Sequence, residues 1–356
     1  MQKKPLNKRF FEKNAQMIFT NLFVRDIIII IAIRLLLLFA KGVFLMHRIL
    51  TISGVYMCLR AYVGNIPMRY QEKYGEGFEF LPGGKGVVAA AAFSALGADS
   101  MLCAKMANDA NGKTLAEFFS AANVSCRYES KAKTDKTGYQ LTIFENDSSW
   151  RTVKFAGANM ALTADDVESA FTCMPDAVYI QKEVPDKIII EACRLAHEKD
   201  IPIFYQPCGP RGELTPAMLG ELEMFIVDAE DVFSYSGVEM RDFESYLQAC
   251  MALESRVRAK KYVVRIDDER GTFIYDSKFH NIIEPHTIAT VDKGGAFEIF
   301  GAATVCEYLK SGNFRRSVTY GNIAYSLSAS RLGDVDSIPT ANEIDDHIKE
   351  NGIDLG

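Results

Sequence analysis

Two glycine-rich stretches contain the residue types best suited to chemistry in this sequence. The first is Pro82-Gly-Gly-Lys-Gly86, and the second is Val291-Asp-Lys-Gly-Gly-Ala-Phe-Glu-Ile-Phe-Gly-Ala302. A helix of small residues is predicted after each stretch. Helix N-termini have free N–H groups and about half a positive charge, which suits phosphate. One such loop is a weak signal, but a second, more than 200 residues later, favours an anion-binding site.

The segments around these loops predict the fold. Between Arg48 and Asp267, short apolar runs such as RILTI, DAVYIQ, MFIVD and YVVRID alternate with helical segments. This alternation predicts an α/β fold with βαβ crossovers and a mostly parallel sheet that has helices on both faces. Ligands of such sheets bind beyond the carboxyl ends of the strands. Two strand-rich stretches, near 59–82 and 135–155, are too polar for the main sheet, and we expect them to form a small β-flap lid.

Composition excludes several classes of protein. The 356 residues are 48% hydrophobic and 24% charged, with a net charge of −6. A soluble globular protein has this composition, and no basic field is present to hold nucleic acid. The eight cysteines show no metal-binding spacing. They are expected to be reduced thiols, as in a cytoplasmic protein.

Residues 1–45 differ in kind from the rest. They are basic and lead into a mostly apolar run from Ile27 to Met46, which is long enough to span a bilayer. However, Arg34 lies inside the run and would cost about 2.5–3.5 kcal/mol on insertion. We favour an upstream extension with Met46 as the natural start; a membrane anchor and a soluble helix are the alternatives. The folded domain is predicted to span 46–356.

Seven landmarks in order resemble the ribokinase-like (PfkB) family of carbohydrate kinases across 46–356. They are FEFLPGGKGVVAAAAFSALGA, AGANMALTADDVESA with YIQKEVP, FYQPCGPR, FIVDAEDVFSYSG, ERGTFIYD, the second glycine stretch, and NIAYSLSASRLGDVDSIPTANEI. The resemblance implies a Rossmann-like fold with a β-flap lid. It also implies phosphoryl transfer from ATP, with Mg²⁺, to a hydroxyl of a sugar or nucleoside. A monovalent cation and a homodimer through the lid are further family features.

The resemblance assigns the catalytic base to the second glycine stretch, which is one residue shorter than the family motif. If the gap lies late, Gly295 and Ala296 match the family's charge-cradling Gly-Ala, Phe297 replaces the second Gly, and Glu298 replaces the catalytic Asp. If the gap lies early, Phe297 occupies the base position. We prefer Glu298, because that placement keeps a carboxylate. The alternative for Phe297 is a core aromatic that closes an empty site.

The resemblance also implies binding residues. Cys58 aligns with the family's sugar-binding Asp, and Val88 aligns with its Asn, so two polar partners for a sugar are absent. The implied substrate-side residues are Gly83, Gly84, Lys85, Glu183, Asp292 and Cys58. The implied ATP-side residues are Asp228, Arg265, Gly271, Gly294 and Asn322, with Asp228 and Asp231 as the Mg²⁺ residues.

Two functions of different class follow. The first is an ATP-dependent carbohydrate kinase of altered specificity with Glu298 as base. The second is a catalytically impaired member that binds a small ligand or a protein partner through the same site. We prefer the kinase, and Mg²⁺-dependent ATP turnover would separate the two. The substrate is not specified by these residues; a nucleoside or a modified sugar would fit.

Overall fold

The computed structural model describes residues 46–126, 130–132, 136–146, 149–207 and 219–356. The expectations for residues 1–45 and for Cys208 lie outside this range. Within it, no helix is both long and apolar enough to cross a membrane. The folded unit described below is His47–Gly356.

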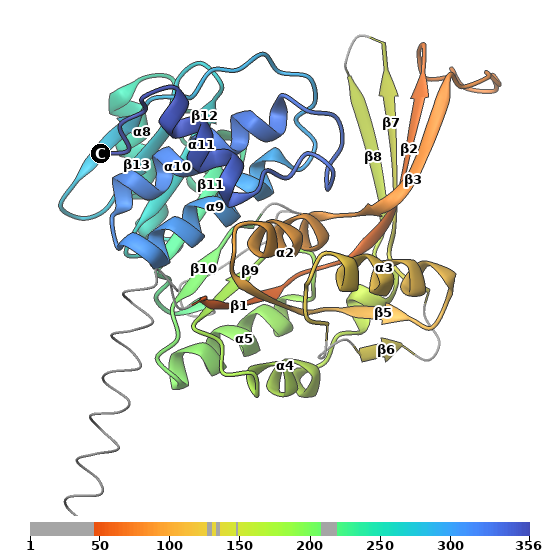
Figure 1. Ribbon diagram of the computed structural model, residues 1–356, viewed down its shortest axis with the longest axis horizontal. Helices are drawn as coiled ribbons and strands as arrows, with labels where there is room; N and C mark the ends of the chain where they lie inside the picture. The colour runs from red at the N-terminus through yellow and green to blue at the C-terminus, as the bar shows by residue number, and fades with distance from the viewer. Residues whose placement is uncertain (1–45, 127–129, 133–135, 147–148, 208–218) are drawn as a thin grey trace, which may run out of the picture. The chain divides into compact units, whose positions relative to one another are not determined.

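An eight-stranded sheet forms the centre of this unit (Figure 1). Its order is β14-β13-β12-β11-β10-β9-β1-β4. Neighbours from β4 to β12 are parallel, whereas β13 and β14 are antiparallel. The strands are β1 (Arg48–Ile52), β4 (Asp99–Cys103), β9 (Ala177–Ile180), β10 (Ile203–Tyr205), β11 (Met224–Asp228), β12 (Tyr262–Asp267), β13 (Gly271–Tyr275) and β14 (His280–Ile283). The predicted mostly parallel sheet is confirmed.

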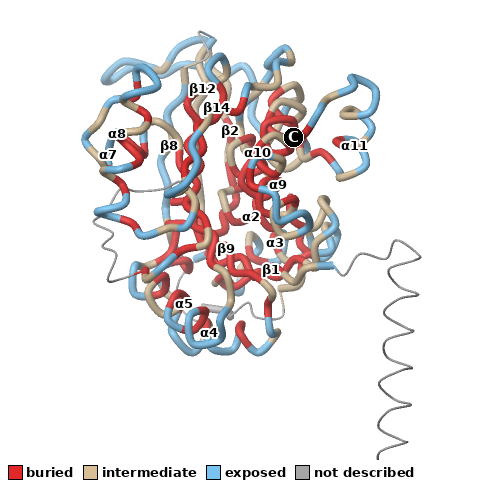
Figure 2. The backbone as a smooth tube through the Cα atoms, turned by 90° about the vertical axis from the view of Figure 1, so that its left-hand side faces the viewer, coloured by how far each residue is buried: buried red, intermediate tan, exposed pale blue. Residues whose placement is uncertain are grey.

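Helices cover both faces of this sheet, so its strands are buried almost throughout (Figure 2). Alternation along β1 shows why: Leu50 and Ile52 pack with one helical layer, and Ile49 packs with the other. The first layer contains α4 (Ala164–Phe171), α5 (Asp186–Glu198), α7 (Ala229–Ser236) and α8 (Phe243–Glu254). The second contains α2 (Lys85–Ala95), α9 (Ala296–Ser311), α10 (Phe314–Ala329) and α11 (Ala341–Glu350). Burial on both faces explains the continuous apolar runs in the sequence.

A separate four-stranded sheet forms the lid and projects beyond the helices in Figure 1. Its order is β3-β2-β7-β8, with β2 (Tyr56–Val63), β3 (Gly77–Gly83), β7 (Tyr139–Glu145) and β8 (Trp150–Phe155). Residues 64–76 connect β2 to β3 and contain the strand-breaking Gly64, Pro67 and Gly75. The lid strand β2 begins at Tyr56, three residues before the predicted stretch.

The remaining elements pack beside the lid. The helix α3 (Ala110–Ala121) contributes Leu115 and Phe119 to a smaller core that includes Val55 and Met57. The strands β5 (Lys105–Ala107) and β6 (Ser130–Ala132) form a short parallel pair. A 3₁₀ turn, η1 (Gly157–Ala161), places the buried Asn159, whose amide bonds both backbone groups of Val55. These contacts fix the point at which the chain enters the lid.

Candidate active site

The first glycine stretch is a tight turn between the lid and α2. Gly84 is the N-cap of α2, with φ 86° and ψ 161°, a combination that is open to glycine almost alone. A Cβ on Gly84 would lie 2.5 Å from Cδ2 of Tyr56, and one on Gly83 would lie 2.5 Å from Sγ of Cys58. The backbone N–H of Gly86 donates to the carbonyl of Gly54 at 3.2 Å. The turn is therefore fixed against the start of β2.

Gly84→Ala is expected to destabilise the protein by about 3 kcal/mol or more, because backbone strain of about 1–3 kcal/mol adds to the clash with Tyr56. Gly97 supplies a matched control, since its φ is also 86° but a Cβ there meets nothing within 4 Å. The free energies of unfolding of Gly84→Ala and Gly97→Ala, measured in urea, would separate the cost of backbone strain from the cost of the steric clash. Equal losses of unfolding free energy in the two variants would contradict the predicted contact.

Lys85 and Glu298 join the two glycine stretches. Lys85 is the first residue of α2, and its Nζ lies 2.8 Å from Oε1 of Glu298. Burial opposes ionisation of Glu298, but the charge and hydrogen bond of Lys85 outweigh it, so that the pKa of Glu298 is lowered. Glu298 is therefore ionised at neutral pH and able to accept a proton.

The second glycine stretch caps α9. Gly295 is the N-cap, with φ 74°, and Ala296 is the first, fully buried helical residue. The ring of Phe297 stacks on Phe300, with centroids 5.9 Å apart and planes at 14°. The carbonyl of Phe297 accepts from Nε2 of Gln206, the residue after β10, at 2.8 Å. The structure therefore brings Glu298 to the first glycine stretch and places the Phe297 ring against its own helix.

Asp292 links the second glycine stretch to the lid through an ion pair with Arg60 of β2. Its Oδ2 lies 2.6 Å from a guanidinium nitrogen of the buried Arg60, and its Oδ1 accepts from the N–H of Gly294 at 2.9 Å. The N–H of Gly333 donates to Oδ2 at 3.2 Å. Burial works against ionisation, but the bond from Arg60 outweighs it and lowers the pKa of Asp292.

Glu183, which follows β9, contacts both the lid and α2. Its Oε2 accepts from the backbone N–H of Lys85 at 3.2 Å, and its Oε1 pairs with Nζ of Lys154 on β8. Cys58 lies on the same face of the lid as Lys154, because both pair with Gln140 in neighbouring strands. Burial, followed by the charge of Asp334, raises the pKa of the Cys58 thiol to about 12. The position therefore offers a neutral, weak hydrogen-bonding group.

These contacts define what is called the charged cluster below: Arg60, Lys85, Lys154, Glu183, Asp292, Glu298 and Asp334. All the predicted substrate-side residues either belong to the cluster or touch it. Sequence reasoning missed Arg60, Lys154 and Asp334. Because residues two apart in a strand lie on the same face of a sheet, Arg60 could have been predicted to lie on the same face of the lid as Cys58. No pattern in the sequence indicated Asp334.

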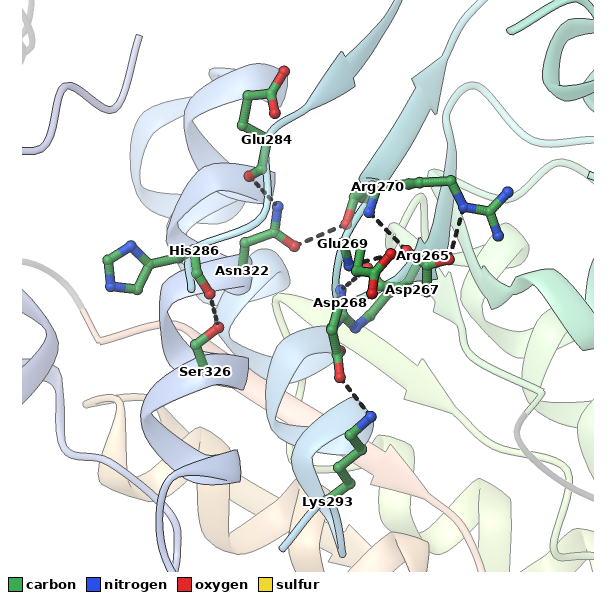
Figure 3. A network of polar contacts seen from close by, with 11 residues as sticks. Arg265, Asp267, Asp268, Glu269, Arg270, Glu284, His286, Lys293, Asn322 and Ser326 are labelled. Carbon is green, nitrogen blue, oxygen red and sulfur yellow. Dashed lines mark hydrogen bonds and ion pairs between the residues drawn. The ribbon is translucent and has the colours of Figure 1, made fainter. Parts of the chain in front are cut away.

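The predicted nucleotide side lies around Arg265 and Asn322 (Figure 3). Arg265 stacks over the ring of Tyr325 at 3.5 Å and pairs with Asp268, which also pairs with Nζ of Lys293 at 2.5 Å. Asn322 accepts from the hydroxyl of Thr272 at 2.8 Å and donates to the carbonyl of Glu284 at 3.1 Å. Arg265, Asp268 and Asn322 line a pocket of about 170 Å³, and Asn322 also lines a neighbouring one of about 430 Å³.

The other nucleotide-side candidates have different surroundings. Asp228 pairs in register with Arg265 across β11 and β12, and its Oδ1 caps α7 by accepting from the N–H of Asp231 at 2.7 Å. Gly271 has φ 80°, and a Cβ there would collide with the carbonyl of Ile283, which gives this glycine a structural role in the β12–β13 turn. No group of three or more His, Cys, Asp or Glu suited to a metal occurs in the described part of the chain.

Three comparisons relate this chain to known proteins. A family model described as pfkB family carbohydrate kinase matches residues 46–341. The ribokinase of Bacillus subtilis is 26% identical over 309 residues, which cover 85% of this chain and 99% of the relative. The bifunctional ribokinase/ribose-5-phosphate isomerase A of Fructilactobacillus sanfranciscensis is 26% identical over 278 residues, which cover 77% of this chain but 50% of that relative.

Solved structures agree on the fold. The structure of Arabidopsis thaliana ribokinase complexed with ribose and ATP matches with a TM-score of 0.78 at 19% identity, covering 86% of this chain and 99% of that one. Ribokinase from Giardia lamblia matches with a TM-score of 0.77 at 17% identity, covering 85% of this chain and 100% of the other. The predicted ribokinase-like fold and the predicted family are confirmed.

Proposed function

Since the chain belongs to the pfkB family of carbohydrate kinases, we propose that it transfers a phosphoryl group from ATP to a hydroxyl of a sugar or nucleoside. The observation that carries this proposal is the meeting of the two glycine stretches at Lys85 and Glu298. There an ionised carboxylate and a lysine lie at the N-termini of α2 and α9. The N-cap residues of both helices are glycines and provide no side-chain cap. At α2 the first backbone N–H, that of Lys85, already donates to the carboxylate of Glu183. Both ends therefore favour negative charge.

In this proposal Glu298 accepts the proton of the attacking hydroxyl. Lys85 breaks its ion pair with Glu298 and binds the transferred phosphoryl group. Gly295 and Ala296 would present backbone N–H groups to the charge that develops in the transition state. The N–H of Ala296 would first have to leave the carbonyl of Lys293, to which it donates at 3.2 Å. Gly83, Gly84, Glu183 and Asp292 would position the substrate. Phosphoryl transfer depends mainly on such alignment and charge neutralisation.

The nucleotide would lie along Arg265 and Asn322. Lys293 and Arg265 share one carboxylate, Asp268, so both cations can reach a polyphosphate that competes with it. Gly294, which follows Lys293 in the second glycine stretch, would present its backbone to the phosphates. Asp228 and Asp231 would hold Mg²⁺ through water, because this hard cation prefers oxygen atoms. Asp228 caps α7 with only one of its two carboxylate oxygens. Bound there through water, Mg²⁺ would neutralise phosphate charge. A monovalent cation beside Asp292 stays a prediction.

The test is Mg²⁺-dependent formation of ADP by the full chain across a panel of pentoses, hexoses and nucleosides. Turnover with one acceptor that disappears with EDTA is the expected result. ATP binding without turnover of any acceptor would leave a protein that binds ligands through this site, the alternative function. The ribokinase names of the relatives make ribose the first acceptor to include.

We also propose a homodimer through the outer face of the lid, in a cytoplasmic protein. The register places Leu59, Phe80, Leu141 and Val153 in one row across the four strands. Phe80 contacts Tyr139, which contacts Phe155, and the side chains of Phe78, Val153 and Phe155 are each more than half exposed. An apolar patch of this kind on an isolated sheet marks an interaction surface, and a second copy is its natural cover.

Phe80→Asp is expected to convert the dimer to monomer, because it buries a charge at the centre of that patch. Sedimentation velocity at several protein concentrations measures the change. Phe233→Asp, at a half-exposed phenylalanine on α7, is the matched control and should leave the dimer intact. A wild-type chain that is monomeric at every concentration would overturn the proposed dimer.

A further inference from the structure

Among themselves, six of the seven members of the charged cluster pair one to one; Arg60 also lies 3.9 Å from the exposed carboxylate of Glu79. The pairs are Arg60 with Asp292, Lys85 with Glu298, and Lys154 with Glu183. Asp334 is the seventh, and its carboxylate has no hydrogen bond or ion pair to any described residue; only its backbone carbonyl accepts, from Ser337. The cluster therefore has one negative charge more than its cations balance.

The position of Asp334 is set by both glycine stretches. A Cβ on Gly294 would collide with its Oδ1, and a Cβ on Gly83 would lie 3.7 Å from its Oδ2 and 2.5 Å from Sγ of Cys58. The main chain of Asp334 passes 3.3 Å from the place of a Cβ on Gly295. The carboxylate thus lies between the two turns, beside the neutral thiol of Cys58.

This position is electrostatically unfavourable for an ion. Burial raises the pKa of Asp334; Arg60 on β2 and Lys85 on α2 lower it, and Glu298 and Asp292 raise it, with a net increase. A partly buried carboxylate without a partner costs folding free energy. Such a residue within a site is a candidate for ligand binding, because a bound donor removes the cost.

We propose that Asp334 accepts hydrogen bonds from hydroxyl groups of the acceptor substrate and so replaces the carboxylate that Cys58 does not provide. The inference rests on the proposed function and narrows it. Because the cluster already has an excess negative charge, the acceptor is a neutral polyhydroxylated molecule. A sugar phosphate would place a second uncompensated anion beside Asp334.

Calorimetric titration of the full chain, without nucleotide, tests this with neutral sugars, nucleosides and sugar phosphates as probes. Asp334→Asn is expected to weaken binding of the preferred neutral acceptor about 10- to 100-fold, as for loss of a hydrogen bond to a charged group. ATP affinity should stay unchanged, and the melting temperature should stay equal or rise. Asp336→Asn is the matched control, since Asp336 is exposed in the same loop.

Each outcome decides the inference. Acceptor affinity that is unchanged in Asp334→Asn would overturn it, as would a preference for sugar phosphates or no acceptor binding by the wild type. A lower melting temperature together with weaker ATP binding would show a merely structural residue, and also overturn it. Acceptor binding that depends on Asp334 in a wild type without ATP turnover would support the inference while refuting the kinase.

Discussion

Glu298→Gln is expected to lower kcat for the phosphoryl acceptor about 10²–10⁴-fold, the usual effect of removing a general base. The amide keeps the size of the side chain and its hydrogen bond to Lys85, but it cannot accept the proton. KM for the acceptor should change little, because Asp334 and the residues around it bind the substrate in this proposal. Steady-state ADP formation at saturating Mg²⁺ and ATP measures both constants.

Glu307→Gln is the control for this variant. Glu307 is also a buried, ion-paired carboxylate on α9, and its partner Arg316 is on α10. Its loss should affect stability but not kcat. Should Glu298→Gln retain full activity, the base would have to come from another group and the late placement of the gap would be wrong. The early placement, with Phe297 at the base position, would then be preferred.

The architecture was predictable because it depends on patterns that are local in the sequence. Burial on both faces requires continuous apolar runs such as MFIVD, and the turn at Gly84 requires glycine, so both are visible in the sequence. The lid was also predictable in outline, since its strands alternate polar and apolar residues. Its exact ends were not, because β2 begins where Asn159 holds the chain, a contact between residues 104 positions apart.

The chemistry of the site was less predictable, because it depends on pairs that are distant in sequence. Lys85 and Glu298 are separated by 213 residues, and Arg60 and Asp292 by 232. The motifs identified all of these residues except Arg60, but they did not show which basic residue pairs with which acidic residue. Asp334 follows a glycine in a loop that has no recognisable motif. Its carboxylate becomes a candidate for binding only because the structure places it between the two glycine stretches.

Lys85→Met is expected to lower the free energy of unfolding by about 2–4 kcal/mol, somewhat below the usual cost of breaking a fully buried pair. Lys85 is 26% exposed and Glu298 is 8% exposed, so the variant leaves mainly Glu298 as an unpaired, buried charge. Methionine and lysine have similar helix propensities, so α2 itself is little affected. Urea unfolding of the variant near neutral pH measures the loss.

The double variant Lys85→Met with Glu298→Gln tests whether the unpaired charge of Glu298 causes the lower unfolding free energy of Lys85→Met. If the unpaired charge is responsible, the double variant should be more stable than the sum of the single losses predicts, by about 1–3 kcal/mol. Lys349→Met is the control, because Lys349 and its partner Asp346 are both exposed, and such a pair contributes about 0–1 kcal/mol.

The pH dependence supplies a second check on the same pair. Because the folded-state pKa of Glu298 is lowered, the pair stabilises the protein above the unfolded pKa of about 4.3 and loses this effect as the pH falls through the folded pKa. Without Lys85, only a backbone hydrogen bond and the charge of Lys154 oppose the effect of burial on Glu298. We therefore expect the pKa of Glu298 to be higher in the variant, so that the carboxyl takes up a proton when the pH falls. The loss in Lys85→Met should therefore be smaller in acid than at neutral pH. A loss of unfolding free energy that does not depend on pH would mean that Lys85 stabilises α2 by packing and not through its ion pair. Glu298 could then act as a base without first breaking an ion pair with Lys85.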